Sequence, residues 1–208
     1  AGEDFFRLEG DKSIEIPQGA RYMSILSNEK SIEISNASQS LRVITMMGNG
    51  DIENPEVLFL NCKKFRIVDI YPGRLANALL DAMGDMRLLR HFSHIVPVEL
   101  PNSVLNLFNL QILYTDKPMA QGFGRLINLH TVPKIQLCKC GCFFNIRELK
   151  NMNKIRKLRM SGLCIASISD ANEARLHSKR NLEVLELDFN GWKSCSEHTE
   201  RSYGNEDT

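Results

Sequence analysis

The sequence has little net charge and no long apolar run. Its 26 Lys and Arg residues balance 25 Asp and Glu residues, which leaves a formal net charge of +1 over 208 residues. A chain without a strong positive field is poorly suited to general nucleic-acid binding. No apolar stretch reaches the roughly 18–20 residues that a membrane-spanning helix needs. We therefore expect protein partners, with no nucleic acid and no membrane span.

Signals of secretion are also lacking. The chain begins at Ala1 without an apolar signal segment, and three of its six cysteines crowd between residues 138 and 142. The disulfide frameworks of secreted domains do not have such uneven spacing. The sequence therefore favours a reducing compartment, the cytoplasm and also the nucleus. Its start predicts a fragment of a longer chain.

Motifs for nucleotide binding, metal binding and catalysis are lacking as well. No phosphate-binding loop ends in Gly-Lys-Ser/Thr, and Gly122-Phe123-Gly124 lacks the third glycine of a dinucleotide site. The Cys-x-Cys-x-Cys run at residues 138–142 lacks the two-residue gap of a zinc knuckle. His91 and His94 fall on different faces of an expected strand, without a neighbouring nucleophile. We expect no catalytic, cofactor-binding or metal-binding residue, and we predict that the chain is not an enzyme.

What the chain does contain is a repeated pattern. Residues Leu182–Leu187 have the form Leu-x-x-Leu-x-Leu, and Leu41–Met46 and Phe65–Ile70 have the same shape. Looser copies start at residues 20, 89, 110, 129 and 155, so that successive starts lie 19 to 27 residues apart. Leucine-rich repeats have periods of roughly 20–29 residues. The spacing therefore predicts about eight irregular leucine-rich repeats between residues 20 and 192.

Each copy is expected to form one strand of a shared sheet. The last two apolar residues of the pattern lie two apart, so they point to the same side of a strand. Stacked units bury that side over one core, beneath parallel strands about 4.8 Å apart. We predict an α/β fold, a curved leucine-rich-repeat solenoid with a parallel β-sheet on its concave side and short helices and loops on its convex side. Ile44, Val68, Leu158 and Leu185 should line the interior.

A second apolar spacing supports the repeats. Three segments carry apolar residues three apart, which suits a tight helical turn. They are Val104, Leu107 and Leu110, then Phe123, Leu126 and Leu129, then Ile146, Leu149 and Met152. Apolar residues between 74 and 90 are spaced as on one face of a longer helix. Ser169 or Asp170 is expected to cap another helix that runs to Arg175.

The ends of the chain differ from its middle. Residues 1–19 are interpreted as a lead-in from an absent upstream module. Residues 193–208 are interpreted as a polar disordered tail or an inter-repeat loop, because the segment from Ser194 onwards has no Val, Ile, Leu or Met. Within the repeats, Pro133 and Lys134 stand where an inward strand residue is expected. The register between residues 129 and 155 therefore stays open.

Recognition in such a fold would use the side chains between the inward positions, because repeat solenoids bind partners on their concave face. The candidate partner-binding residues are Ile67, Asp69, His91, Ser93, Ile112, Tyr114, Lys157, Arg159 and Glu186. Arg159 and Glu186 occupy the same position in adjacent repeats, so we predict that they are neighbours.

Four arginines share another position of the repeat. Arg21, Arg42, Arg66 and Arg90 each follow the first apolar residue of their copy. Stacked repeats would bring these like charges onto one edge, where they repel unless acids or a partner compensate them. Two interpretations stay open, screening by solvent and local acids, or docking of an acidic partner surface.

Several segments resemble one known family. Leu107-Phe108-Asn109-Leu110-Gln111-Ile112-Leu113 resembles the NLxNLQxL step of plant disease-resistance proteins, and Gly124–Leu129 is similar to the GxLxNLxxL step that follows it. Ile146–Met152 resembles their IxELKNLxxL segment, and Asn172–Leu182 resembles the grass version of their EA…L..K..L..L.L block. These are coiled-coil, nucleotide-binding, leucine-rich-repeat immune receptors, and the resemblance covers nearly the whole chain.

The resemblance implies a role in recognition and autoinhibition. In that family the first repeats dock on the nucleotide-binding module and hold it inactive, which makes the four arginines a candidate intramolecular docking edge. The concave face is then expected to recognise a pathogen effector or a guarded host protein. ATP or ADP is expected only in the nucleotide-binding module, which this chain does not contain.

The alternative is a generic leucine-rich-repeat scaffold, such as the substrate-binding part of an F-box ubiquitin ligase subunit. An F-box or a nucleotide-binding module upstream of Ala1 would separate the two interpretations.

Overall fold

A computed structural model describes residues 4–10, 13–27, 29–48, 50–71, 80, 82–94, 100–115, 119–137, 144–163 and 166–189. The chain forms two compact units, Ala1–Lys117 and Pro118–Thr208.

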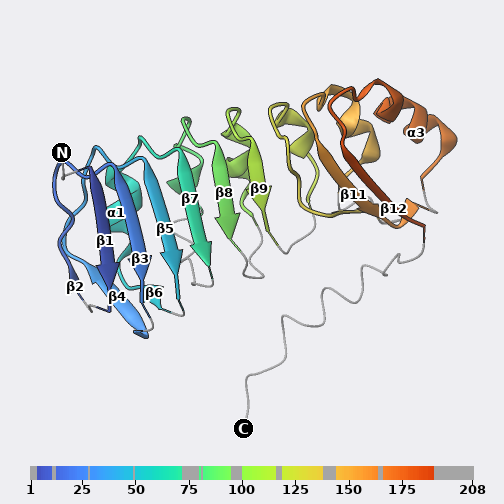
Figure 1. The fold of residues 1–208 in the computed structure, drawn as a ribbon. Coiled ribbons are helices and arrows are strands. Elements are labelled where there is room, and N and C mark those ends of the chain that lie inside the picture. The colour runs from blue at the N-terminus through green and yellow to red at the C-terminus, as the bar shows by residue number, and fades with distance from the viewer. Residues whose placement is uncertain are drawn as a thin grey trace, which may run out of the picture. The chain divides into compact units, whose positions relative to one another are not determined.

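The first unit is built on a six-stranded parallel sheet whose strand order follows the chain (Figure 1). Its strands are β1 (Phe5–Glu9), β3 (Tyr22–Leu26), β5 (Val43–Met47), β7 (Ile67–Tyr71), β8 (His91–His94) and β9 (Ile112–Tyr114). Five of them begin where the repeat pattern predicts strands, which confirms the α/β class with a parallel sheet. β1 pairs with β3, so that Leu8 lies beside Ile25. The segment predicted as a lead-in therefore contributes a strand to this sheet.

Buried apolar residues alternate with more exposed ones along the strands, and packing of the buried side chains holds neighbouring strands together. Ile44, Val68 and Phe92 are register partners on neighbouring strands, and all three are fully buried. Burying a side chain of this size stabilises a fold by roughly 1.5–3 kcal/mol. The prediction that Ile44 and Val68 line an interior is confirmed.

The connections after β1, β3 and β5 contain further parallel strands. They are β2 (Ser13–Ile14), β4 (Ser31–Ile34) and β6 (Asp51–Ile52). Ile32 and Ile34 alternate with polar residues and are fully buried, which is the spacing of a strand. The prediction of short helices and loops is therefore wrong for the connection after β3, which contains β4. The connection with β2 lies in the segment predicted as a lead-in. After β6 the chain does form a helix, α1 (Pro55–Asn61).

Tight turns appear in the later connections, as the spacing of three predicted. η1 (Asn102–Asn106) is a 3-10 helix, and the Leu107 amide donates to the Val104 carbonyl at 3.0 Å. The Leu110 amide donates to the Leu107 carbonyl at 2.9 Å, and all three side chains are fully buried. Of the longer helix predicted between residues 74 and 90, Leu80, Ala82 and Met83 are helical, and residues 72–79 and 81 lie outside the described part. The described residues from Gly84 to Arg90 are not helical, so the predicted helix is too long at its end.

Asparagine side chains join consecutive connections. Asn54 Nδ2 donates to the Ile34 carbonyl at 2.7 Å, and Asn54 Oδ1 accepts from the Ile34 amide at 2.9 Å. Asn36 makes the same pair of hydrogen bonds with Ile16 one repeat earlier. The repeat pattern gave no sign of this role, because the bonds depend on which main-chain groups stacking brings opposite each asparagine.

Replacing Asn54 with alanine is expected to lower the free energy of unfolding by about 2 kcal/mol, because an amide and a carbonyl lose their partners. Asn61→Ala is the matched control, since the Asn61 side chain is exposed and, among the described residues, bonds only to the Val57 carbonyl within α1. Its effect should stay within about 0.5 kcal/mol. Urea unfolding followed by circular dichroism measures both variants. Equal losses would contradict a role for Asn54 in joining repeats.

The second unit repeats this plan over a three-stranded parallel sheet. Its strands are β10 (Ile135–Gln136), β11 (Lys157–Ser161) and β12 (Val184–Asp188). The 3-10 helices η2 (Phe123–Arg125) and η3 (Ile146–Asn151) fall on the predicted spacings of three, and a further one, η5 (Leu176–Ser178), precedes β12.

The helix α3 (Ile168–Ala174) confirms a predicted element but corrects its start. Ser167 Oγ accepts from the Asp170 amide at 3.0 Å, and the Asp170 carboxylate accepts from the Ser167 amide at 3.3 Å. This reciprocal pair is a capping box, in which the residue before the helix and the third helical residue satisfy each other's amides. Neither Ser169 nor Asp170 is the cap itself, because the helix already begins at Ile168.

The strand predicted after Leu129 is interrupted. Thr131 pairs with Lys157 and Ile135 pairs with Met160, so four steps along this stretch face three steps along β11. The extra residue forms a bulge around Pro133, which has no amide hydrogen to donate to a neighbouring strand. The bulge fixes the register of residues 131–136, where Ile135 pairs with Met160 and is fully buried. Residues 138–143, which belong to the stretch whose register the sequence leaves open, lie outside the described part.

The prediction that Leu185 on β12 lines the interior is wrong. Leu158 on β11 is fully buried, but its register partner Leu185 is 44% exposed. β12 is an edge strand of its sheet, and no described strand pairs with its other side. The repeat pattern therefore places Leu185 in register, whereas burial also requires a covering neighbour.

A lysine takes an inward position in the last turn. Lys179 lies three residues before Leu182, where the earlier turns have apolar residues, and it is only 5% exposed. Its Nζ donates to two main-chain carbonyl oxygens near the end of η3 and to Asn153 Oδ1. Burial, and secondarily Arg175, lowers the pKa of Lys179. The ammonium group thus caps carbonyl groups at the end of η3 in the preceding repeat.

Residues 193–208 lie outside the described part of the chain, so the expected tail is not described. In the described ranges, no helix has the length and apolar content to cross a membrane.

Candidate interaction surfaces

The predicted partner-binding residues of the first unit lie on one face of the six-stranded sheet, called the open face below. They form two rows across β7, β8 and β9, namely Ile67, His91 and Ile112, then Asp69, Ser93 and Tyr114. Side chains alternate along a strand, so both rows point away from the buried Val68 and Phe92. The structure thus brings all six positions together.

Ser93 is the exception in accessibility. Its register is as predicted, but it is only 8% exposed, so the expectation that it faces a partner is wrong. The small Ser93 side chain lies between two larger ones, those of its register partners Asp69 and Tyr114 on the flanking strands.

The first row continues across the three strands before β7. It includes Val43 on β5, Tyr22 on β3 and Phe5 on β1, and Phe5 and Tyr22 are 60% and 42% exposed. Phe5 was missed because its segment was interpreted as a lead-in. Phe5 lies three residues before the buried Leu8, so alternation along a strand places the two side chains on opposite faces. That spacing was the available signal. The whole set is called the apolar row, and comprises Phe5, Tyr22, Val43, Ile67, His91 and Ile112.

Burial and the charge of Asp69 act in opposite directions on the pKa of His91. Burial lowers the pKa of His91, and the negative charge of Asp69 opposes that shift only in part. His91 is therefore uncharged at neutral pH. Its Nε2 is buried and has no hydrogen-bond partner in the described part of the chain. Asp69 itself is half-buried and forms no ion pair with a described residue.

The corresponding face of the second unit is charged. Lys157 and Arg159 on β11 and Glu186 on β12 are exposed. Arg159 Nε lies 3.0 Å from Glu186 Oε2, which confirms that the two are neighbours. Because both side chains are more than half exposed, the pair contributes only about 0–1 kcal/mol.

The predicted arginine edge is assembled by the main chain. The Arg42 amide donates to the Arg21 carbonyl at 2.8 Å, the Arg66 amide to the Arg42 carbonyl at 2.7 Å, and the Arg90 amide to the Arg66 carbonyl at 2.8 Å. The four residues therefore stack where consecutive strands begin, as predicted. Arg21 pairs with Asp4 at 3.4 Å, whereas the other three form no ion pair with a described acid.

The glycines considered for a dinucleotide site have a structural role. The Glu148 carboxylate accepts from the Gly122 amide at 3.0 Å and from the Gly124 amide at 2.8 Å. A Cβ on Gly124 would lie 2.7 Å from the Glu148 carbonyl oxygen. The amides at the start of η2 are thus bound to an internal carboxylate of the next repeat.

One cysteine, Cys62, lies in the described part of the chain. Cys62 is fully buried, its Sγ donates to the Ser38 carbonyl at 3.1 Å, and burial raises its pKa to about 11. It is therefore protonated at neutral pH and unreactive. The cysteines at residues 138–142 lie outside the described part. Within that part, no three His, Cys, Asp or Glu residues are grouped to hold a metal ion.

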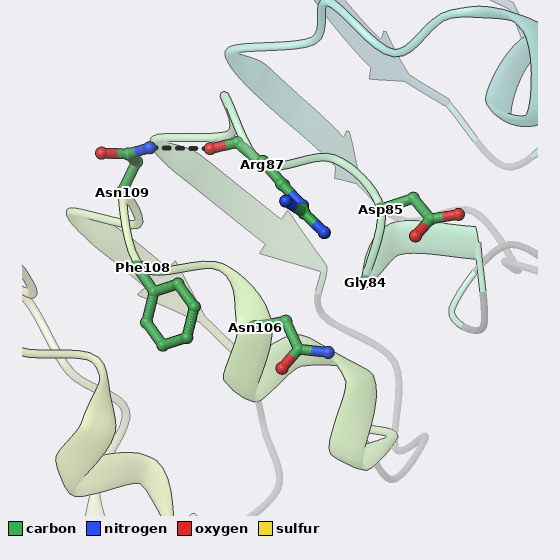
Figure 2. Close-up of a pocket in the computed structure, with 6 residues that line it drawn as sticks. All are labelled: Gly84, Asp85, Arg87, Asn106, Phe108 and Asn109. Carbon is green, nitrogen blue, oxygen red and sulfur yellow. Dashed lines mark hydrogen bonds between the residues drawn. The ribbon is translucent and has the colours of Figure 1, made fainter.

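A shallow hollow lies between η1 and the segment that leads into β8 (Figure 2). Its volume is about 390 Å³, and it is lined by Gly84, Asp85, Arg87, Asn106, Phe108 and Asn109. Asn109 Nδ2 donates to the Arg87 carbonyl at 2.8 Å, which Figure 2 shows as a dashed line. A Cβ on Gly84 would lie 2.5 Å from the Ser103 Cβ. These contacts join one repeat to the next, and we assign no ligand to the hollow.

Parallel strands in constant register, joined by turns with apolar residues three apart, define a protein of repeated α/β units. Residues 146–206 match the model of the family described as R13L1/DRL21 LRRs, which are leucine-rich repeats of the plant resistance-protein type. That stretch includes η3, β11, α3 and β12. This part of the chain is therefore similar to the interaction repeats of plant resistance proteins.

A second similarity is to a protein of a different kind. The chain is 28% identical over 136 residues to ATP synthase subunit s, mitochondrial, of Macaca fascicularis. The similarity covers 59% of this chain and 65% of that protein, just under two thirds of its length.

Proposed function

We propose that this chain is the protein-interaction part of an intracellular plant immune receptor, shaped as a curved leucine-rich-repeat solenoid and acting in the cytoplasm and nucleus. Its open face would recognise a pathogen effector or a guarded host protein. Its arginine edge would hold a nucleotide-binding module inactive. The proposal gives this chain no catalytic role and no cofactor, since ATP or ADP would bind in the nucleotide-binding module.

The observation that carries the proposal is the stacked arginine edge. Arg42, Arg66 and Arg90 immediately precede the neighbouring strands β5, β7 and β8, and they have no described acid to pair with. Like charges brought together by the main chain repel one another, and an acidic surface on a docked module would relieve that repulsion. The similarity of residues 146–206 to plant resistance repeats supports the choice of receptor.

Reversing two of these charges is the direct test. The double variant Arg42→Glu, Arg66→Glu is expected to weaken binding to the nucleotide-binding module of the same receptor by about tenfold or more, because attraction becomes repulsion. Binding is measured by titrating the separately expressed module with the full chain. In plant cells the variant receptor should signal without a pathogen.

The matched control changes the net charge equally at another place. Lys30→Glu, Lys64→Glu alters two exposed lysines outside the arginine edge and should leave docking unchanged. Docking that survives reversal of Arg42 and Arg66, or that the lysine control weakens equally, would overturn the proposed docking edge.

The second candidate is a leucine-rich-repeat scaffold within a different assembly, such as the substrate-binding part of an F-box ubiquitin ligase subunit. The similarity to a protein named as an ATP synthase subunit favours it, because that protein is no plant receptor. The coding sequence upstream of Ala1 discriminates the two candidates. A nucleotide-binding module there supports the receptor, and an F-box supports the scaffold.

A further inference from the structure

We propose that the open face of the six-stranded sheet binds an extended peptide segment of a partner protein, in which a Lys or Arg side chain reaches Asp69 and neighbouring apolar side chains cover the apolar row. The inference rests on the recognition role proposed above and names the chemistry of the recognised segment.

The apolar row supplies the contact surface. Its six members are register partners on six consecutive strands, which at about 4.8 Å per strand makes a line about 24 Å long. Phe5 and Tyr22 are substantially exposed at one end, and the members from Val43 onwards are half-buried. His91 belongs to this line as an uncharged ring. Leu26 and Met47, four residues farther along β3 and β5, are 46% and 62% exposed on the same face. Exposed apolar surface gathered on one face is typical of a binding surface.

The charge beside the line determines what the segment must carry. The next row along the strands runs from Arg7 through Ser24, Thr45 and Asp69. Arg7 is paired with Glu9, whereas Asp69 forms no ion pair with a described residue. A guanidinium or ammonium group brought by a partner would form a charge-assisted hydrogen bond with this carboxylate.

The size of the face favours a peptide over a second copy of the chain. Six strands about 4.8 Å apart and three to five residues long cover roughly 430 Å², against the roughly 800 Å² per partner of a standard stable interface. A second open face would also bring no cation to Asp69, because its Arg7 is already paired with Glu9. An extended segment presents side chains on one side every 6.6–6.8 Å or so, and it can place one basic residue among apolar ones.

The test is selection from a displayed library of short random peptides on the full chain. Peptides enriched by the wild-type chain should carry a Lys or Arg with apolar residues on both sides of it. Synthetic copies of the enriched peptides are then titrated by fluorescence anisotropy. Asp69→Lys should weaken their binding by about tenfold or more, and Ile67→Asp by a similar factor.

Two control variants distinguish a peptide site on the open face from adsorption to any exposed apolar side chain and from binding at the arginine edge. Leu60→Asp replaces an apolar side chain that is 61% exposed on α1, outside the open face, and it should leave peptide binding unchanged. Arg42→Glu, Arg66→Glu should also leave it unchanged, so a failed docking edge and a failed peptide site give different results.

Several outcomes would overturn the proposal. They are no enrichment of peptides, enriched peptides without a basic residue, and full binding by Asp69→Lys. Concentration-dependent pairing of the chain that Ile67→Asp abolishes would instead assign the face to a second copy.

Discussion

Gly48→Ala is expected to destabilise the first unit by more than about 4 kcal/mol, an amount comparable to the whole stability of many domains. Gly48 has a φ of +130°, which side-chain-bearing residues rarely adopt. A Cβ there would lie 1.8 Å from the Ser27 carbonyl oxygen. Ser27 cannot yield freely, because its amide donates to the Met47 carbonyl at 3.2 Å.

The loss at Gly48 has two contributions, backbone strain at a positive φ and the clash of the new Cβ with Ser27. Gly10→Ala separates them. Gly10 also has a positive φ, +79°, but a Cβ there would meet nothing within 4 Å. This variant therefore tests backbone strain alone, and a loss of about 1–2 kcal/mol is expected. Thermal unfolding followed by circular dichroism, together with the soluble yield of each variant, measures the difference. A Gly48→Ala protein no less stable than Gly10→Ala would show that the close approach to Ser27 does not exist.

The second large effect is expected at Leu158, where alanine should cost about 3–4 kcal/mol. The Leu158 side chain is fully buried in the second unit, and deleting it removes apolar contacts and leaves a cavity. Leu185 occupies the same place in the next repeat, yet it is 44% exposed. Leu185→Ala should therefore cost about 1 kcal/mol or less, since most of what it removes already contacts solvent.

Urea unfolding of the two leucine variants provides the measurement. The pair is matched in residue type, substitution and position in the repeat, so the difference isolates burial. A loss at Leu185 as large as that at Leu158 would show that another segment covers β12 in solution, and it would restore the interior that the repeat pattern predicts.

Much of the fold follows from the order of apolar residues. Spacings of two and of three are local properties of the chain, and they predicted the parallel strands at Ile44 and Val68 and the 3-10 turn at Leu107. They also predicted that Arg42 and Arg66 would stack, because equal positions in consecutive repeats become neighbours once the strands pair. The register of Arg159 with Glu186 follows from the same rule.

What the pattern could not supply depends on neighbours that are distant in the sequence. Burial of Leu185 requires a covering segment, and a repeat carries no information about whether one follows. The role of Asn54 depends on main-chain groups that lie 20 residues away, and the inward turn of Lys179 depends on carbonyl oxygens at the end of the preceding repeat. The extension of the apolar row to Phe5 was decided in the same way, by the pairing of β1 with β3. The sequence by itself determined which residues share a position in the repeat. Tertiary structure alone decided which of those positions are covered, paired or left open, because these outcomes depend on contacts between repeats.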